Sequence, residues 1–312
     1  MYSAFEPTTS LTILDGGMGR ELHRMGAPFR QPEWSALALM LAPETIEQAH
    51  RRFAEAGAEV ITTNSYALVP FHIGEAKFKA EGQKLADLAG RLARKVAEGA
   101  RHEVRVAGSL PPLFGSYRPD LFDEVRAPQI IGPLIDGLSP HVDLWLAETQ
   151  SSLAEARFAK SALDGDKRPF WISFTLDDEN QDLARPKLRS GECVAAAVTA
   201  MLELGVDAVL FNCSQPEVME GAVDAARAIR EARGVKAAIG VYANAFAPQR
   251  EEVANETISD IRPDLDPARY AEFAQGWLQH GADIIGGCCG IGPEHIAALK
   301  ALRVPLRHGD GA

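Results

Sequence analysis

The sequence predicts one (β/α)8 barrel, or TIM barrel, as a single domain over residues 1–312. Eight short, largely apolar runs recur along the chain, segments with helical spacing separate them, and one glycine-containing motif appears at three of the boundaries. Runs that are apolar rather than alternating are typical of strands buried on both faces. Eight such strands alternating with about eight helices favour a closed barrel, with a doubly wound open sheet as the alternative.

The predicted strands are four to six residues long and rich in Val, Ile, Leu or Phe. In chain order they are Leu11–Leu14, Ala58–Thr63, Val104–Gly108, Val142–Ala147, Phe170–Phe174, Ala208–Phe211, Ala237–Val241 and Ala282–Ile285. Segments with clear helical spacing are Pro43–Ala56, Ala76–Arg101, Ser151–Leu163, Gly191–Leu204, Pro216–Arg233, Pro267–His280 and Pro293–Leu302. A further helix is expected within Phe122–Leu138, where two prolines interrupt the pattern.

Three predicted helices end in a shared motif: a glycine, then Ala or Val, then an acid, then apolar residues. The copies are Gly57-Ala58-Glu59-Val60, Gly205-Val206-Asp207-Ala208 and Gly281-Ala282-Asp283-Ile284. Glycine accepts the left-handed conformation that ends many helices, so the chain can turn directly into a strand. The repeat therefore predicts the short connections of a parallel sheet.

Nucleotide-binding motifs are incomplete or missing. A doubly wound sheet normally carries a Gly-rich phosphate loop after its first strand. The run Gly16-Gly17-Met18-Gly19 does not complete that loop, because Leu22 stands where the third glycine belongs. The sequence also lacks the glycine–lysine loop of P-loop enzymes. These observations favour the barrel over the open sheet.

Composition and charge exclude several classes. Hydrophobic residues make up 46% of the 312 residues and charged residues 24%, as in ordinary globular proteins. The net charge of −11 argues against nucleic acid or an anionic membrane as a partner. The longest stretch without a charged residue, Val60–Gly74, contains Pro70 and Asn64 and does not resemble a membrane span.

The first ten residues, MYSAFEPTTS, lack the basic and apolar regions of a signal peptide. A cytoplasmic location is therefore expected. Because that compartment is reducing, no disulfide is expected among the four cysteines.

Polar residues follow several predicted strands. Active sites of such barrels lie at the carboxyl ends of the strands, so these positions are informative. They include Asp15 after the first run, Glu148 after the fourth, Asn212 and Cys213 after the sixth, and Cys288 and Cys289 after the eighth.

Three of the cysteines are expected on one rim. Zinc prefers thiolate and imidazole ligands, and catalytic sites use three of them with a fourth position open. Cys213, Cys288 and Cys289 supply three thiolates. Reactive thiols and simple buried packing remain as alternatives. Cys193 lies in an Ala-rich helical segment, where we expect it to pack within the protein.

The two rim acids are weighed in the same way. Glu148 follows an apolar strand, where a carboxylate is costly without a partner or ligand, so a functional role is favoured. Asp15 precedes two glycines and fits a turn or helix cap equally well. His280 and His295 lie within predicted helices and suit structural or exposed roles. No Gly-x-Ser-x-Gly elbow of a serine hydrolase is present.

Seven motifs, in order along nearly the whole chain, resemble those of the homocysteine S-methyltransferase family. They are LDGGMGREL (Leu14–Leu22), ITTNSY (Ile61–Tyr66), GSLPP (Gly108–Pro112), AETQSSLAEA (Ala147–Ala156), WISF (Trp171–Phe174), FNCSQPE (Phe211–Glu217) and GGCCGIGPEHI (Gly286–Ile296). The resemblance implies a (β/α)8 barrel and a Zn²⁺ ion held by Cys213, Cys288 and Cys289. It also implies that Asp15 and Glu148 bind the amino-acid substrate.

This resemblance leads to a mechanistic expectation. The reaction would transfer a methyl group from a sulfonium donor, S-methylmethionine or S-adenosylmethionine, to the thiol of homocysteine, forming methionine. Asp15 and Glu148 would hold the substrate ammonium, and backbone N–H groups at Gly16–Gly19, with Gly16 and Gly17 as substrate-binding residues, would receive its carboxylate. Asn212 would either contact substrate or metal, or only orient a loop.

Several alternatives stay open at this point. The methyl donor is left undecided by the segment GSLPPLFGSYR (Gly108–Arg118) and the acidic loop Leu176–Leu188. Betaine or a corrinoid is the alternative donor, and a thiol other than homocysteine is the alternative acceptor. A non-catalytic zinc store or thiol sensor is the competing class. The expected partners are a small-molecule thiol and a methyl donor, with homo-oligomerisation left open.

Overall fold

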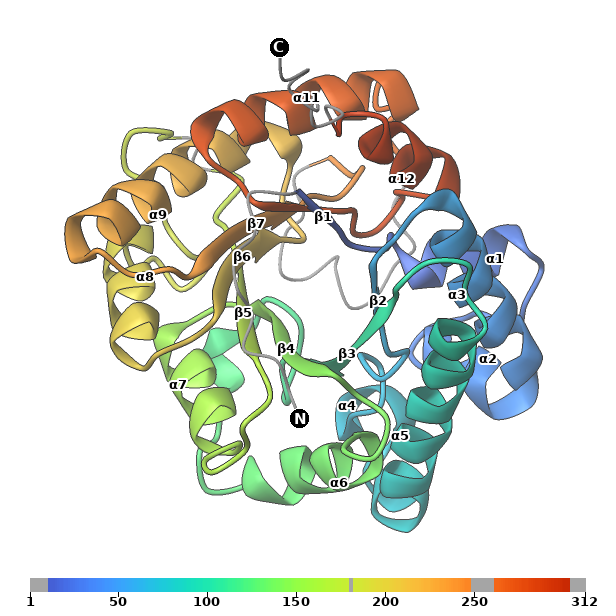
Figure 1. Ribbon diagram of the computed structural model, residues 1–312. Coiled ribbons are helices and arrows are strands. Elements are labelled where there is room, and N and C mark those ends of the chain that lie inside the picture. Colours follow the sequence, from blue (N-terminus) through green and yellow to red (C-terminus); the bar gives the residue numbers. More distant parts are fainter. Residues whose placement is uncertain (1–10, 180–181, 248–260, 304–312) are drawn as a thin grey trace.

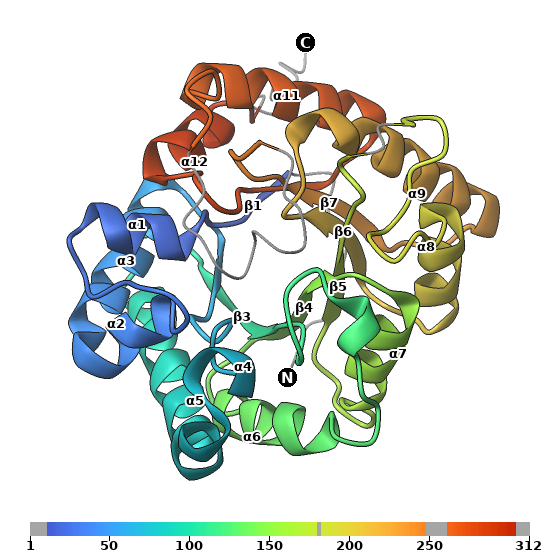
Figure 2. The same ribbon diagram turned by 180° about the vertical axis from the view of Figure 1, so that it is seen from behind.

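Eight parallel strands form a closed barrel inside a ring of helices (Figures 1 and 2). The computed structural model describes residues 11–179, 182–247 and 261–303. The strands are β1 (Thr12–Ile13), β2 (Val60–Thr62), β3 (Arg105–Leu110), β4 (Leu144–Gln150), β5 (Phe170–Thr175), β6 (Ala208–Asn212), β7 (Ala238–Tyr242) and β8 (Ile284–Ile285). All eight predicted strands are confirmed.

Eleven α-helices accompany the strands in the described part of the chain. They are α1 (Met18–Arg24), α2 (Ser35–Leu41), α3 (Pro43–Ala56), α4 (Pro70–Ile73), α5 (Glu75–Glu98), α6 (Pro128–Leu138), α7 (Leu153–Ser161), α8 (Val194–Glu203), α9 (Met219–Arg233), α11 (Pro267–His280) and α12 (Pro293–Lys300). Two 3-10 turns, η1 (Pro119–Leu121) and η2 (Pro216–Val218), precede α6 and α9.

Strand order follows the chain around the barrel. Each strand pairs in parallel with its sequence neighbours, and β1 pairs with β8. A parallel bridge between Leu14 and Val60 closes the ring between β1 and β2. In this topology the carboxyl ends of all strands meet at one rim, so residues far apart in sequence become neighbours there.

The repeated glycine motif has the predicted conformation. Gly57, Gly205 and Gly281 have φ values of 115°, 70° and 110°, in the left-handed region. The acid of the motif forms hydrogen bonds to the neighbouring strand. Asp207 accepts from the N–H of Phe170, and Asp283 accepts from the N–H of Ile239. The motif therefore ends a helix and anchors the start of the next strand.

Two layers of side chains hold this frame. A compact cluster fills the barrel interior, with Trp171, Leu146 and Leu210 fully buried in it. A larger cluster packs the outside of the strands against the helices, and Trp145 and Phe53 are fully buried there. Burial on both faces explains why the strands read as apolar runs rather than alternating ones.

Three features differ from expectation. Helices α1, α2 and α4 are not predicted, because with seven, seven and four residues they are too short to show helical periodicity. The helix expected within Phe122–Leu138 begins only at Pro128, where proline is tolerated in the first turn. The expectation for Cys193 is wrong: it immediately precedes α8 and is exposed rather than packed within the protein.

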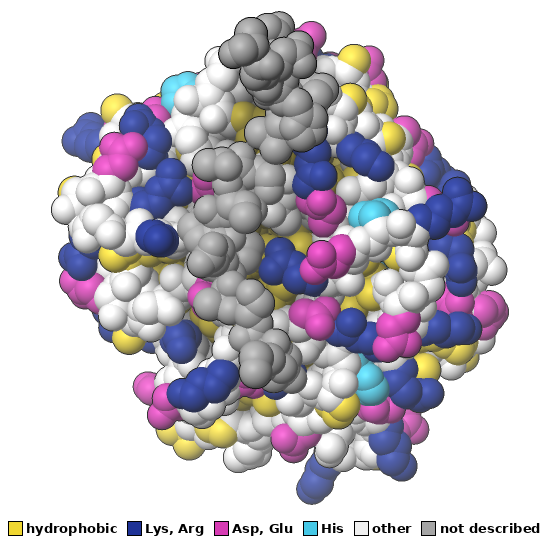
Figure 3. Space-filling view, viewed as in Figure 1, with side chains coloured by type: hydrophobic (Ala, Val, Ile, Leu, Met, Phe, Trp, Pro, Cys, Tyr) yellow, Lys and Arg dark blue, Asp and Glu magenta, His cyan; other side chains and the backbone are white. Residues whose placement is uncertain are grey.

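The surface of the face seen in Figure 3 carries interspersed basic and acidic side chains. Within the described ranges, no helix combines the length and apolarity needed to cross a membrane. Residues 1–10, on which the expectation about a signal peptide rests, lie outside the described residues.

Candidate active site

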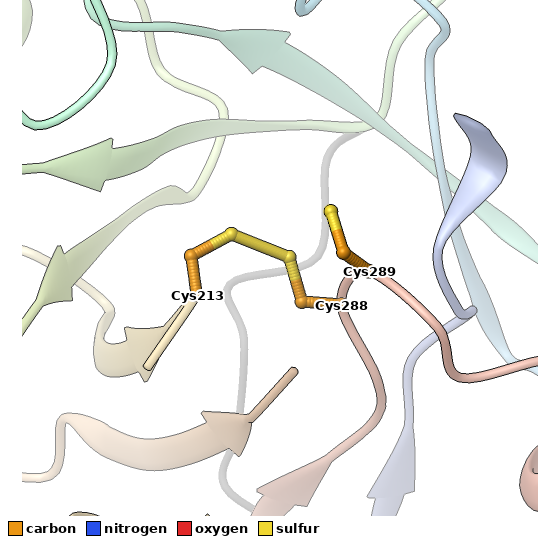
Figure 4. A group of neighbouring side chains, drawn as sticks. All are labelled: Cys213, Cys288 and Cys289. Carbon is orange, nitrogen blue, oxygen red and sulfur yellow. A yellow bond between two sulfur atoms is a disulfide. The ribbon is translucent and has the colours of Figure 1, made fainter. Parts of the chain in front are cut away.

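Three cysteine sulfurs meet at the carboxyl rim of the barrel (Figure 4). Cys213 directly follows β6, whereas Cys288 and Cys289 follow β8. Their Sγ atoms all lie within 4.8 Å of one another. Among the described residues, no other group of three Cys, His, Asp or Glu side chains converges in this way. The rim position predicted for the three cysteines is confirmed.

Cys213 and Cys288 are joined as a disulfide, with a Cα–Cα distance of 5.8 Å (Figure 4). The expectation that no cysteine is paired is therefore wrong for these two. That expectation rested on the compartment alone, whereas the barrel brings residues 75 positions apart within bonding distance. Cys289 remains a free thiol with partial exposure.

The cysteine loop is pinned by backbone hydrogen bonds. The N–H of Cys288 donates to the carbonyl of Ala243 at 2.8 Å, and the carbonyl of Cys289 accepts from Ala245 at 2.8 Å. The N–H of Gly287 donates to the carbonyl of Asp15 at 3.0 Å. The vicinal pair is thus fixed against the residues that follow β7 and β1.

The glycines after β1 allow a close approach to this loop. A Cβ on Gly17 would lie 2.4 Å from the carbonyl oxygen of Cys288 and 3.0 Å from the Cα of Cys289. The N–H of Gly17 donates to the carbonyl of Ile291 at 2.9 Å and is already engaged. Gly16 is packed equally closely, since a Cβ there would lie 2.3 Å from the carbonyl oxygen of Ile291. These glycines therefore allow the rim to pack closely. The N–H of Gly17 does not serve as a free donor for the substrate carboxylate.

Asp15 is a buried carboxyl group, 6% exposed, at the end of β1. Its oxygens accept hydrogen bonds from the N–H and the Oγ1 of Thr62, at 2.7 and 3.1 Å. Burial raises the pKa of Asp15 to about 7, and the nearby charge of Glu148 acts in the same direction. Asp15 therefore does not cap a turn or a helix, the role considered from the sequence, because its hydrogen-bond partner Thr62 lies on β2.

Glu148 lies within β4 and lines the same cavity as Asp15. Its Oε1 accepts a short hydrogen bond from Ser109 Oγ on β3. Burial raises the pKa of Glu148 to about 7. Strongly shifted pKa values of neighbouring groups that line one cavity are typical of a functional site.

Asn212 is fully buried behind the rim. Its Oδ1 accepts from the N–H of Thr149 at 3.1 Å and from Ser173 Oγ at 2.8 Å. Its Nδ2 donates to Thr149 Oγ1 at 2.8 Å. The amide is engaged on both sides and does not line the cavity. Both partners lie on strands, Thr149 on β4 and Ser173 on β5, so the amide joins neighbouring strands rather than orienting a loop.

One cavity of about 150 Å³ brings these groups together. Both acids and all three cysteines line it. Aromatic and polar side chains complete its wall: Trp34, Tyr66, Tyr117, Tyr242, His72, Thr62, Asn64, Thr149 and Arg20. Its lining, mostly apolar and aromatic with a few polar groups, is typical of a site for a small molecule.

Unusual backbone geometry is concentrated in this cavity. Trp34, Tyr117, Thr149 and Cys213 have φ values of 49°, 63°, 60° and 49°. Among the described residues they are the only non-glycine residues with positive φ, and all four line the cavity. Such conformations persist where surrounding contacts impose them, and they cluster at functional sites.

Trp34 and Tyr117 line the cavity but are not among the site residues predicted from the sequence. Trp34 precedes the unpredicted helix α2, and Tyr117 lies in the loop after β3. Both come from irregular segments, where periodicity says nothing about side-chain direction. The GSLPPLFGSYR segment (Gly108–Arg118), which left the methyl donor undecided, was the available signal for Tyr117.

Comparison with known proteins identifies the family. The family model described as homocysteine S-methyltransferase matches residues 12–302. The chain is 28% identical to a homocysteine S-methyltransferase of Escherichia coli strain K12, over 93% of this chain and 94% of the relative. It is 26% identical to a selenocysteine Se-methyltransferase of Brassica oleracea var. italica, over 98% of this chain and 93% of the relative.

Solved structures agree with this result. The metallated form of the homocysteine methyltransferase MmuM from Escherichia coli superposes with a TM-score of 0.74 at 26% identity, covering 94% of this chain and 96% of that one. An oxidized form of the same protein gives 0.75 at 27% identity, with 93% and 95% covered. With the family model matching nearly the whole sequence, this chain is an enzyme of the homocysteine S-methyltransferase family.

Proposed function

We propose that the enzyme transfers a methyl group from a sulfonium donor, S-methylmethionine or S-adenosylmethionine, to the thiol of homocysteine, forming methionine. The observation that carries the proposal is the meeting of three cysteine sulfurs and two buried carboxyl groups in one cavity. Sulfur ligands suit the thiol of the acceptor, and the carboxyl groups suit its ammonium. Relatives named homocysteine S-methyltransferase support the acceptor.

Zinc is the metal that the donor set fits best. Three thiolates around Zn²⁺ at bonds of about 2.3 Å lie about 3.8 Å apart in a tetrahedron. The Sγ atoms of Cys213, Cys288 and Cys289 lie within 4.8 Å of one another, so small side-chain movements suffice once Cys213 and Cys288 are reduced. Bound zinc would supply Lewis acidity that lowers the pKa of an incoming thiol.

The two acids would position the acceptor. In their ionised form, Asp15 and Glu148 accept charge-assisted hydrogen bonds from an ammonium group. Thr62 and Ser109 hold the two carboxyl groups in place by donating to them. An ammonium fixed in this way leaves the thiol end of the acceptor directed to the cysteine side of the cavity.

A cationic donor suits the charge of the site. The acceptor thiol loses its proton to solvent, and the thiolate sulfur forms a bond to the methyl carbon while the bond between that carbon and the sulfonium sulfur breaks. The donor leaves as a neutral thioether that carries the electron pair of the broken bond. A net negative cavity attracts the sulfonium ion, and close alignment of the two sulfurs and the methyl carbon lowers the barrier.

The test combines metal analysis with a donor screen. Protein purified under reducing conditions without chelators should carry close to one zinc per chain. Homocysteine would be supplied with S-methylmethionine, S-adenosylmethionine or betaine, and methionine would be measured. We expect methionine with a sulfonium donor and none with betaine. Turnover with betaine alone would overturn the donor assignment, and zinc binding without turnover with any donor would favour a non-catalytic zinc protein.

A glycine substitution tests the packing beside the cysteines. In Gly17→Ala the new Cβ would collide with the backbone of Cys288 and Cys289, which must then shift. We expect the dissociation constant for zinc to rise about tenfold, as for other changes that displace metal ligands. Gly132→Ala is the matched control, since a Cβ in that helix meets nothing within 4 Å. Equal zinc affinity in both variants would contradict this role of Gly17.

A further inference from the structure

A buried ion pair lies behind Cys213. Arg189 and Asp178 both belong to the segment between β5 and α8, and their side chains are 6% and 0% exposed. The Arg189 Nη2 lies 3.2 Å from the Asp178 Oδ1. The guanidinium also stacks on the ring of Tyr117, 4.0 Å from its centroid. Neither charged residue lines the cavity.

Three side-chain donors from this cluster converge on one carbonyl oxygen, that of Cys213. Tyr117 Oη lies 3.3 Å from it, Thr175 Oγ1 3.4 Å and Arg189 Nη2 3.5 Å. Arg189 Nε also donates to Thr175 Oγ1 at 3.0 Å, which links the three donors. Each contact to the carbonyl is long, so its orientation depends on all three acting together.

The carbonyl that they hold belongs to a strained residue. Cys213 has a φ of 49°, a conformation that residues with a Cβ disfavour. Neither Cys288 nor Cys289 has a positive φ. Rotation of Cys213 toward an ordinary conformation would turn its carbonyl away from the three donors and move its sulfur relative to the other two. Once the disulfide to Cys288 is reduced, the place of Cys213 in the cluster therefore depends on contacts from outside the cluster.

Burial of the ion pair needs an explanation. Desolvating two charges costs free energy that their attraction often fails to recover, so such a pair is weak evidence for a role in stability alone. A guanidinium can bind a carboxylate, stack on a ring and donate to a carbonyl at once, because its donors lie in one rigid plane. Here Arg189 contacts the Cys213 carbonyl itself, and two of its other partners, Tyr117 and Thr175, contact the same carbonyl.

We propose that Arg189, paired with Asp178 and stacked on Tyr117, is a positioning residue that fixes the strained backbone of Cys213 and so sets the geometry of the cysteine cluster for zinc. The inference rests on the proposed function, since it assigns the cluster to a metal. It adds a residue that touches neither the metal nor the substrate but controls how well one ligand is presented.

The molecule supplies a matched control at the opposite end of the same strand. Arg168 precedes β5, pairs with Asp166, and lies over the ring of Trp145 at 4.8 Å from its centroid. It also donates to a backbone carbonyl, that of Ser139, at 2.6 Å. This second pair therefore has the same kinds of contact but none with a cysteine.

The experiment measures zinc affinity by competition with a chromophoric chelator on reduced full-length protein, with thermal unfolding measured alongside. Arg189→Gln is combined with Asp178→Asn, so that no buried charge is left unpaired. We expect the zinc dissociation constant to rise about 10–100-fold, the usual effect of removing a residue that orients a ligand. Arg168→Gln with Asp166→Asn should lower the unfolding temperature but leave that constant within about twofold of wild type.

Arg189→Lys is the conservative variant and covers the case in which the double variant does not fold. It keeps the charge but loses the planar fork, so its dissociation constant should fall between those of wild type and the double variant. A wild-type constant in both Arg189 variants, or an equal rise in the Arg168 control, would overturn the inference. A wild-type protein that binds no zinc would instead overturn the proposed function, and the inference with it.

Discussion

Replacing Cys288 with alanine is expected to abolish both zinc retention and methyl transfer. Cys288 is one of the three cysteines that line the cavity in the described part of the chain, and two thiolates do not complete the coordination that zinc sites in proteins require. Loss of a residue that merely orients a ligand already costs 10–100-fold, so we expect activity to fall by more than about 100-fold. Metal analysis and methionine formation would be measured on the same reduced preparation.

Cys193→Ala is the control for this experiment. Cys193 is exposed at the start of α8 and takes no part in the cluster, so its removal should change neither zinc content nor turnover. A Cys288→Ala enzyme with normal zinc content would remove Cys288 from the ligand set. Activity lost in both variants would indicate a general sensitivity to cysteine loss rather than a metal site.

Replacing Glu148 with glutamine is expected to weaken binding of the thiol substrate while zinc is retained. Glutamine keeps the shape and can still accept from Ser109, but it loses the negative charge that an ammonium requires. A hydrogen bond to a charged group contributes about 1.5–3 kcal/mol. We therefore expect KM for homocysteine to rise about 10–100-fold, with a smaller change in kcat.

The pH dependence of the wild-type enzyme provides a second measurement of the same role. Burial raises the pKa values of Glu148 and Asp15 to about 7, so both groups are largely protonated below that pH. Because the carboxylate form binds the ammonium, kcat/KM for homocysteine should rise as pH increases through about 7. Glu148→Gln should show a shallower rise, since one of the two titrating groups is gone.

The stability of the folded protein depends on pH in the opposite direction from kcat/KM. A carboxyl group whose pKa is higher in the folded than in the unfolded protein takes up protons on folding. Glu148 and Asp15 therefore make the free energy of unfolding decrease as pH rises from about 4 to about 7. Glu148→Gln should be more stable than wild type above pH 7, because it no longer buries that charge. Denaturant unfolding at several pH values measures this difference.

Glu155 is a matched control for both effects. It is also buried, with a pKa raised to about 7 by burial, but it caps α7 through Ser151 and Ser152 and does not line the cavity. Glu155→Gln should alter stability without changing KM. An unchanged KM in Glu148→Gln, or an equal rise in Glu155→Gln, would remove Glu148 from the substrate site.

Prediction from the sequence succeeded where periodicity and local chemistry carry the information. Helices α3 and α11 have the predicted bounds, Pro43–Ala56 and Pro267–His280. The cysteines and acids were placed at one rim because parallel strands end there together. The short helices α1, α2 and α4 were missed, since fewer than two turns do not establish a pattern.

Within the site, the direction of individual side chains could not be predicted from the sequence. Asn212 immediately precedes Cys213, yet its amide is buried against Thr149 and Ser173 while Cys213 lines the cavity. Arg189 appeared in no motif, because its partners come from β3, β5 and β6 or from the loops that follow them. Such a convergence is a property of the assembled barrel and has no counterpart in sequence spacing.

The barrel, its order of strands and helices, and the rim on which Cys213, Cys288, Cys289, Asp15 and Glu148 gather could all be predicted from the sequence. They follow from hydrophobic periodicity and from glycines at the turns, which act over a few residues. The folded barrel was needed to show that Cys213 and Cys288 come within bonding distance and that Asn212 turns away from the cavity. Positive φ values at Cys213 and Thr149 set these directions, and contacts between distant segments, rather than local preference, impose such conformations.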